Sequence, residues 1–472
     1  MSQSVMNDRR WRGVPGCAVL GLAAFTVVAL ACTEDETTES TDATRAPNVL
    51  FILVDDARWD VLGAYGNADV RTPNLDRFAA EGMRLDGLHT ASPICNPSRA
   101  SFLTGRYPDG EGLSVQNPRT AIEPGTPTVA HVMRRAGYVT GFVGKSHLGG
   151  NPRRWGFEEI PINIPGAHFA DGKRRFVLFE DGKPERYSGH ATERLADRAI
   201  RFIEDHRAEP WFLWLATTAP HYPYVASPDF PFQASEIRAP AGWPSEYALP
   251  SEVLARYYSL LGRLDREIGR VLDALDAQGL ADDTLVFMTS DNGLEFGAHG
   301  FEAKGTWFDT TARVPGLVRW PGRVAAGSTS RELVSSVDWL PTLRELTDQS
   351  ADPELPGSSF LAVLRGEKST RKLAYAMTRG ATRGRIWNWT MVTDGRFKLV
   401  SNAEGELTQF YDLADGSHET RSRLGQAEYA AEQSALEEGL AEFLGSPLRR
   451  IQSPRDSSRA GSAGQAGSRS EQ

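Results

Sequence analysis

The sequence predicts an α/β fold with a large, mixed but mostly parallel sheet sandwiched by helices, followed by a small antiparallel sheet with one helix. From residue 47 onward, short apolar runs alternate with helical patterns, which is the rhythm of a parallel sheet. The longest runs are continuously apolar, as expected for strands buried on both faces. The chain has 472 residues, 40% of them hydrophobic, enough for one large domain and a smaller one.

Four of the apolar runs are followed at once by residues that can carry chemistry. The runs are 49–54 (VLFILV), 138–143 (YVTGFV), 211–216 (WFLWLA) and 285–289 (LVFMT). The residues that follow them are, in order, Asp55 and Asp56, Lys145 and His147, His221, and Asp291 and Asn292. Each ending taken alone is also an ordinary turn or cap sequence. In open α/β sheets ligands bind beyond the carboxyl ends of the strands, so the four endings together favour one shared site.

Oxygen ligands in this set indicate a cation site. Asp55, Asp56 and Asp291 bring carboxylates. Asn292 brings an amide oxygen. An all-oxygen set suits a hard cation, either calcium or magnesium, rather than zinc. We therefore expect a divalent cation at this edge of the sheet.

One cysteine belongs to the globular part of the chain. Cys17 and Cys32 lie in or at the edge of the N-terminal apolar segment, which leaves Cys95 and excludes a disulfide framework. Pro97 suits the start of a helix and Gly105 its end. Cys95 is therefore expected at a helix N-terminus, where negative charge is favoured. An inert buried side chain and a reactive thiol of lowered pKa both remain open at such a position.

The segment around this cysteine resembles the signature of the sulfatase family, which is Cys-x-Pro-Ser-Arg followed by x-x-x-Leu-Thr-Gly. The matching residues are Cys95, Pro97, Ser98, Arg99, Leu103, Thr104 and Gly105. Further blocks resemble the family in its order, over roughly residues 47 to 430. They are Asp55 and Asp56 with Arg58 and Asp60, 65–67, 72–76, 144–149 with Ser146 where many members carry Trp, 220–223, 290–293 and 304–306.

The resemblance implies a fold and a domain layout. It implies an alkaline-phosphatase-like catalytic domain over residues 47–370 and a C-terminal subdomain over residues 371–446. Residues 385–400 and 410–413 look like the small antiparallel sheet of that subdomain, and the helical pattern over 427–444 looks like its covering helix.

The resemblance also implies a chemistry. A formylglycine-generating enzyme would oxidise Cys95 to formylglycine, whose hydrated aldehyde is the nucleophile of a sulfuric ester hydrolase. The implied cation is Ca²⁺, with Mg²⁺ as the alternative, and its implied ligands are Asp55, Asp56, Cys95, Asp291 and Asn292. The implied catalytic residues are Cys95, Arg99, Lys145, His147, His221 and Lys304.

Each of the supporting residues has an expected role. Arg99 would stabilise the charge on the nucleophile. Lys145 and Lys304 would hold the sulfate oxygens. His221, with Lys304, would protonate the leaving alcohol, and His147 would take a proton so that sulfate is released.

Four other residues near these motifs are further candidates for the site, without an assigned role in catalysis or metal binding. His299 follows the metal motif and is a further candidate for the pocket. Tyr222, Trp307 and Asp309 are candidates for substrate contacts.

The N-terminal residues predict export. Arg9, Arg10 and Arg12 precede an apolar stretch over 14–31, the layout of a signal peptide. The stretch ends at Cys32 in a sequence that resembles a bacterial lipobox, with Ala29 where Leu is more usual. We expect residues 1–32 to be an export signal and Cys32 to anchor the protein through lipid in the periplasm or at the cell surface. A cleaved, soluble form and an uncleaved anchor are the alternatives.

The two flanking segments are predicted to be disordered, and the net charge bears on the kind of partner. Residues 33–46 are polar and acidic and predict a disordered tether, and residues 447–472 predict a disordered tail. A net charge of −9 argues against a nucleic-acid partner.

The expected activity is hydrolysis of a sulfate ester of an alcohol or sugar, with sulfated carbohydrate as the natural substrate and aryl sulfates as artificial ones. A phosphonate monoester or phosphodiester hydrolase of the same superfamily would use the same motifs. An inactive glycan-binding lipoprotein that kept the fold is a second alternative.

Overall fold

The larger sheet is mixed, and its central strands are parallel. In the described part of the chain it has ten strands. In spatial order they are β11 (Ser328–Ser330), β2 (Met83–Leu85), β10 (Gly316–Arg319), β9 (Thr284–Ser290), β1 (Asn48–Val54), β8 (Trp211–Ala216), β4 (Val139–Lys145), β5 (Glu159–Ile164), β6 (Phe176–Glu180) and β7 (Lys183–Tyr187). The four predicted strands are the adjacent, parallel strands β9, β1, β8 and β4, so the predicted fold class is confirmed.

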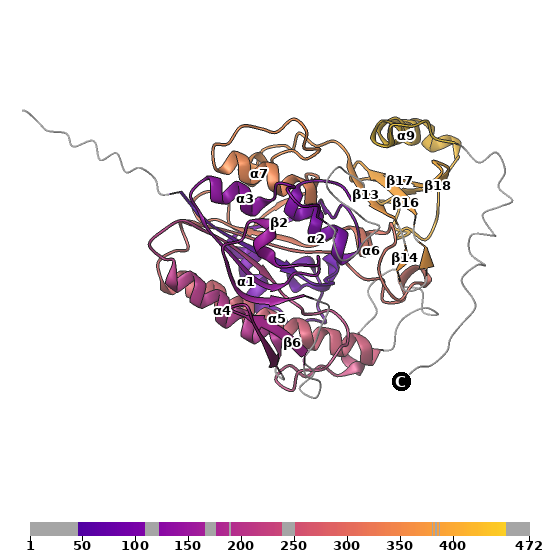
Figure 1. The fold of residues 1–472 in the computed structure, drawn as a ribbon. Helices are drawn as coiled ribbons and strands as arrows, with labels where there is room; N and C mark the ends of the chain where they lie inside the picture. Colours follow the sequence, from indigo (N-terminus) through magenta and orange to yellow (C-terminus); the bar gives the residue numbers. More distant parts are fainter. Residues whose placement is uncertain are drawn as a thin grey trace, which may run out of the picture. The chain divides into compact units, whose positions relative to one another are not determined.

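Helices cover both faces of this sheet (Figure 1). One face packs against α1 (Pro73–Glu81), α4 (Ala191–Asp205) and α5 (Ser251–Ala277). The other packs against α2 (Cys95–Thr104), α3 (Val129–Arg135), α7 (Trp339–Leu346) and α8 (Leu361–Leu364). Successive side chains of β1 point to opposite faces of the sheet. Leu50 and Ile52 therefore pack in the core on one face, and Phe51 and Leu53 pack in the core on the other.

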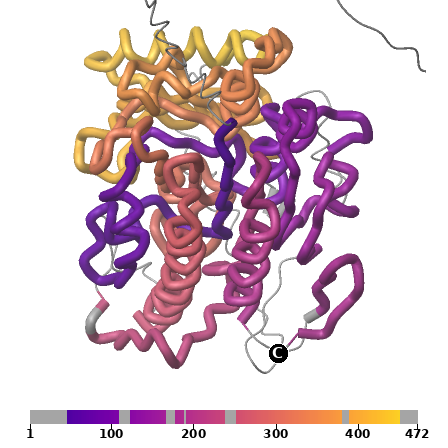
Figure 2. The backbone as a smooth tube through the Cα atoms, turned by 90° about the vertical axis from the view of Figure 1, so that its left-hand side faces the viewer, coloured from indigo at the N-terminus to yellow at the C-terminus, as the bar shows by residue number. Residues whose placement is uncertain are grey.

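The computed structural model describes residues 46–108, 122–165, 176–187, 190–237, 251–379, 381–382, 385–386 and 388–449. The predicted export signal with Cys32, nearly all of the predicted tether and most of the predicted tail lie outside these residues. Among the described helices, none is both long and apolar enough to cross a bilayer. Figure 2 shows α4 and α5 side by side, where Arg270 and Asp197 form an ion pair of 2.7 Å.

The small C-terminal sheet is antiparallel. Its four strands are, in order, β13 (Ala374–Thr378), β16 (Trp389–Thr393), β17 (Phe397–Asn402) and β18 (Leu407–Asp412). Helix α9 (Ala430–Leu444) packs on one face through Leu436 and Leu440. The predicted small sheet and its covering helix are therefore confirmed, and β13 is an additional strand that the sequence analysis did not assign. The other face packs against residues that follow Lys304, among them Phe308.

Shorter elements connect these parts. They are β3 (Leu88–His89), β12 (Val334–Ser335), β14 (Ala381–Thr382), β15 (Arg385–Ile386), α6 (Asp309–Ala312) and the 3-10 helices η1 (Trp59–Val61), η2 (Gly63–Tyr65), η3 (Pro152–Trp155), η4 (Ala234–Glu236), η5 (Ala298–Gly300), η6 (Ser336–Asp338) and η7 (Ala427–Tyr429).

Candidate active site

The acidic residues meet because β1 and β9 are neighbouring parallel strands in register. Val54 lies opposite Ser290, so the next residues, Asp55 and Asp291, leave the sheet at the same level. The backbone N–H of Asp56 donates to Asp291 Oδ1 at 3.1 Å. All three carboxylates are buried. The sheet therefore concentrates negative charge at one edge, where ligands bind in such folds.

Asn292 provides the test of whether these residues suit a cation. Its Nδ2 donates to Asp56 Oδ1 at 2.7 Å, but its buried Oδ1 has no hydrogen-bond partner among the described residues. A buried amide oxygen without a donor, beside carboxylates, suits a hard cation. Potential metal-ligand atoms of four residues all lie within 4.8 Å of one another, those of Asp55, Asp56, Cys95 and His221. The residues present therefore fit a calcium or magnesium ion.

Three basic side chains face the three carboxylates. Arg99 is almost fully buried and also donates from Nη1 to the carbonyl of Lys145, the last residue of β4, at 2.9 Å. The ion pairs are Arg99 Nη2 to Asp291 Oδ2 (2.8 Å), Arg99 Nη2 to Asp55 Oδ1 (3.3 Å), Lys145 Nζ to Asp55 Oδ2 (2.5 Å) and Lys304 Nζ to Asp56 Oδ1. Three positive charges thus balance three negative ones inside the protein.

These basic groups decide the protonation of the carboxylates. Burial acts to raise the pKa of Asp55, but Lys145 and the other nearby cations outweigh it and hold the pKa below its ordinary value. The same balance, with Lys304 as the largest opposing charge, lowers the pKa of Asp56. Both side chains are therefore ionised at neutral pH and available as anionic ligands.

Cys95 is the first residue of α2, as predicted, and Gly105 ends that helix in the left-handed conformation with a φ of 67°. Its Sγ lies 2.6 Å from Lys304 Nζ, 3.5 Å from Asp55 Oδ1 and 3.6 Å from Asp56 Oδ1. Burial, followed by the Asp291 carboxylate, raises the pKa of the thiol well above its usual value. Of the two possibilities that the sequence left open for Cys95, a reactive thiol of lowered pKa is therefore wrong for the unmodified side chain.

Two histidines approach the cluster from β4 and β8. His147 has a left-handed φ of 53°, and its buried Nδ1 lacks a hydrogen-bond partner in the described structure. Burial, with Lys145 next in importance, lowers its pKa to about 3. His221 Nε2 lies 3.6 Å from Asp56 Oδ2, and its Nδ1 lies 2.7 Å from the carbonyl of Tyr222. Because a carbonyl only accepts, Nδ1 carries a hydrogen and Nε2 faces the cluster.

The structure thus gathers at one edge of the sheet every residue that the sequence analysis assigned to catalysis or to the metal. His299, Trp307 and Asp309 lie instead in the segment around Lys304 that contacts the small sheet. The residues that the sequence analysis missed are Trp389, Lys398 and Glu419, which hold this segment. They are isolated residues in separate parts of the chain, so no motif marks them.

The chain is similar to proteins of known families. The family model Sulfatase matches residues 47–349, and the model N-sulphoglucosamine sulphohydrolase, C-terminal, matches residues 297–445. The N-acetylgalactosamine-6-sulfatase of Mus musculus is 31% identical over 428 residues, covering 80% of this chain and 76% of that protein.

Two solved structures are similar as well. An enzyme in complex with its substrate D-glucosamine-2-N,6-O-disulfate has a TM-score of 0.75 at 24% identity, covering 85% of this chain and 98% of the other. The phosphonate monoester hydrolase of Agrobacterium radiobacter has a TM-score of 0.68 at 25% identity, covering 84% and 95%.

Proposed function

The chain belongs to the sulfatase family of sulfuric ester hydrolases, and on that premise we propose that it removes sulfate from sugars with a formylglycine made from Cys95 and a bound divalent cation. The observation that carries the proposal is a buried cluster around Cys95. Acidic and basic side chains from the ends of four parallel strands lie in this cluster, together with Lys304. A site with this charge pattern is suited to a tetrahedral oxyanion.

The nucleophile is proposed to arise at Cys95. In its hydrated form, formylglycine supplies a hydroxyl group in place of the thiol. The raised pKa of the thiol supports the need for such a modification, because a buried neutral thiol is a poor nucleophile. A formylglycine-generating enzyme is the partner that we propose for this maturation.

The residues proposed to hold the cation are Asp55, Asp56, Asp291, Asn292 and the modified Cys95. A calcium ion, or magnesium as the alternative, would supply a Lewis acid at these residues, which would lower the pKa of a neighbouring hydroxyl and neutralise charge on the sulfate. The unpartnered Asn292 Oδ1 supports this assignment. Arg99 ties Asp55 and Asp291 together and so keeps two of the ligands in place.

Lys145 and Lys304 are proposed to hold the sulfate oxygens while the bond to the alcohol breaks. Both ammonium groups lie within 4 Å of Cys95 Sγ, at 3.9 Å and 2.6 Å. Buried charges of this kind need no reorganisation when negative charge develops, which makes them effective in the transition state.

The two histidines are proposed to move the protons. His221 presents Nε2 to the site and would protonate the oxygen of the leaving alcohol. His147, whose pKa is lowered to about 3, is neutral at physiological pH and would accept a proton as sulfate is released. The opposite assignment would require His147 to be protonated before the reaction begins, when its buried, positively charged surroundings favour the neutral form.

The proposed substrate is a sugar sulfated on its 6-hydroxyl. The mouse relative is named for a 6-sulfated amino sugar, and the solved enzyme binds a 6-O-sulfated glucosamine. A phosphonate monoester hydrolase is less well supported, because both matching family models are those of sulfatases. An inactive glycan-binding protein is not favoured, since the acidic, basic and cysteine side chains of the site are all present.

The experiment is a cross-assay of the chain co-expressed with a formylglycine-generating enzyme. An aryl sulfate, N-acetylhexosamine 6-sulfates and an aryl phosphonate monoester are compared by kcat/KM. We expect the sulfate esters to be preferred over the phosphonate by roughly a hundredfold or more. A preference for the phosphonate would contradict the proposal and favour the other hydrolase of the superfamily.

We also propose that the protein is exported and anchored by lipid at Cys32. Its support is the basic, apolar and small-residue layout before Cys32. Expressed in a bacterium, the wild-type chain should incorporate labelled palmitate and partition into detergent, because two or more acyl chains bind membranes stably. The Cys32→Ala variant should lose the label, with Cys17→Ala as the matched control. Detergent partitioning without any label would indicate the uncleaved anchor instead.

A further inference from the structure

Lys304 lies in a segment without regular secondary structure. Residues 299–309, called the strap below, form bends between η5 and α6 apart from the ends of those two elements. On the side of the large sheet, Glu295 N donates to the carbonyl of Ala303 at 2.9 Å, and Thr306 Oγ1 donates to the Glu295 carboxylate. Because neither a helix nor a strand holds Lys304, its position depends on what the strap contacts.

The small sheet contacts the strap immediately beside Lys304. The indole Nε1 of Trp389, on β16, donates to the carbonyl of Gly305 at 2.9 Å. Gly305 has a φ of 100°, a left-handed conformation in which a side chain would be strained. Trp389 therefore fixes the peptide between Gly305 and Thr306, one residue beyond Lys304, and limits where the Lys304 side chain can begin.

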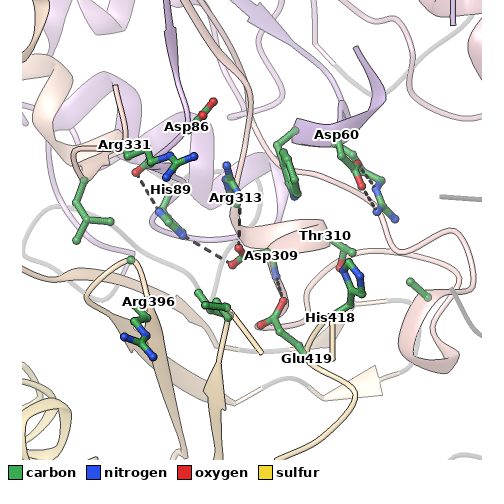
Figure 3. Close-up of a pocket in the computed structure, with 18 of the residues that line it drawn as sticks. Asp60, Asp86, His89, Asp309, Thr310, Arg313, Arg331, Arg396, His418 and Glu419 are labelled. Atoms are coloured by element: carbon green, nitrogen blue, oxygen red, sulfur yellow. Dashed lines mark hydrogen bonds and ion pairs between the residues drawn. The ribbon is translucent and has the colours of Figure 1, made fainter. Parts of the chain in front are cut away.

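A second attachment is a buried ionic cluster. Lys398, on β17, has a fully buried side chain, and its Nζ donates to the carbonyl of Trp307 (3.1 Å), to Asp309 Oδ1 (2.5 Å) and to Glu419 Oε1 (2.6 Å). Glu419 Oε2 accepts from the backbone N–H of Asp309 at 2.7 Å. Figure 3 shows Asp309 between His89 and Glu419, in a pocket that all three residues line.

Charge and packing make this attachment rigid. The Lys398 ammonium is a single buried cation that pairs with two carboxylates. Burial raises the pKa of Glu419 to about 7, and the nearby charge of Asp309 adds to this effect. Such a cluster tolerates little movement, because any lost bond leaves a buried charge unpaired. Phe308 adds apolar contacts to the same face of the sheet, with Trp389 and Tyr411. The strap is thus attached to the small sheet at Gly305 and again at residues 307–309, just after Lys304 in the chain.

We infer that Trp389 and Lys398 are positioning residues that hold the Lys304 ammonium against Cys95 and Asp56 through the strap. The inference rests on the proposed function of Lys304. Its side chain is long and flexible, and only 13% of it is exposed, so its placement depends on a fixed backbone. The small subdomain therefore acts on the active site although Trp389 and Lys398 do not touch the reacting atoms.

The first test is Trp389→Phe, which keeps an aromatic ring and removes the N–H that Gly305 accepts. The matched control is Trp339→Phe, since the buried indole N–H of Trp339 has no partner within the described structure. We expect kcat/KM to fall about five- to tenfold in the first variant, the scale of one buried hydrogen bond, and to change less than about twofold in the control.

A double-mutant cycle shows whether the effect passes through Lys304. In a Lys304→Ala background, Trp389→Phe should have almost no further effect on kcat/KM, because the side chain that it positions is gone. Equal losses in both backgrounds would overturn the inference. The same holds for Lys398→Met, whose matched control is Arg371→Met, a buried cation paired with Asp338 away from the strap.

Hydrogen exchange tests the strap independently of activity. Amides of residues 299–309 should exchange faster in Trp389→Phe than in Trp339→Phe, while those of α5 exchange alike. Equal exchange of the strap in the two variants would overturn the inference even in a protein with unmodified Cys95. If instead the strap loosens but wild-type protein releases no sulfate, the proposed function fails and the structural coupling stands.

Discussion

Cys95→Ala is expected to reduce sulfate release to the background rate, a loss of at least about 10⁴-fold in kcat/KM, as for other catalytic nucleophiles. The substitution removes the thiol, and without it Cβ cannot be oxidised to the aldehyde carbon of formylglycine. It changes little else, because Cys95 is small and buried. Sulfate release from the aryl sulfate, measured beside the wild type, checks this expectation.

The matched control for this variant lies on the same helix. Ser101 is buried and its Oγ has no hydrogen-bond partner in the described residues, so Ser101→Ala should keep nearly full activity and stability. Mass spectrometry of the wild-type peptide should show a loss of about 18 Da at Cys95, the signature of conversion to formylglycine. Full activity with an unmodified thiol would refute the proposed nucleophile.

The second large effect is expected from Asp291→Asn, which removes one charge from the proposed cation site. Asp291 accepts from the N–H of Asp56 and pairs with Arg99, so it connects the ends of β1 and β9 to α2. We expect the variant to lose its bound cation and about 10³-fold in kcat/KM, because both the metal and the partner of a buried arginine are affected. Elemental analysis of the purified protein and initial rates are the measurements.

Asp282→Asn is the matched control, because Asp282 is exposed and precedes β9 at the opposite end of the same strand. Removing the cation from wild-type protein with a chelator should abolish activity, and added Ca²⁺ should restore it. Ca²⁺ should also raise the Tm of the wild type more than that of Asp291→Asn, since a ligand stabilises the state that binds it. A fully active, metal-free wild type would exclude a catalytic role for the cation.

Local sequence patterns specify the framework of the site. Continuous apolar runs marked the four central strands, and the residues after them carried the ligand types of an oxygen-lined cation site. Pro97 and Gly105 marked the helix that begins at Cys95. These signals are local, because strand burial and helix ends depend on residues that are neighbours in the chain.

Tertiary structure decided what the local signals could not. The register of β1 against β9 brings Asp56 to Asp291, although 235 positions separate them in the chain. Burial beside carboxylates, rather than the helix N-terminus, sets the direction of the pKa shift of Cys95. Trp389 and Lys398 come to the Lys304 strap from the small sheet, about ninety positions later in the chain. Contacts between distant residues leave no periodic pattern in the sequence, so only the packed structure reveals them.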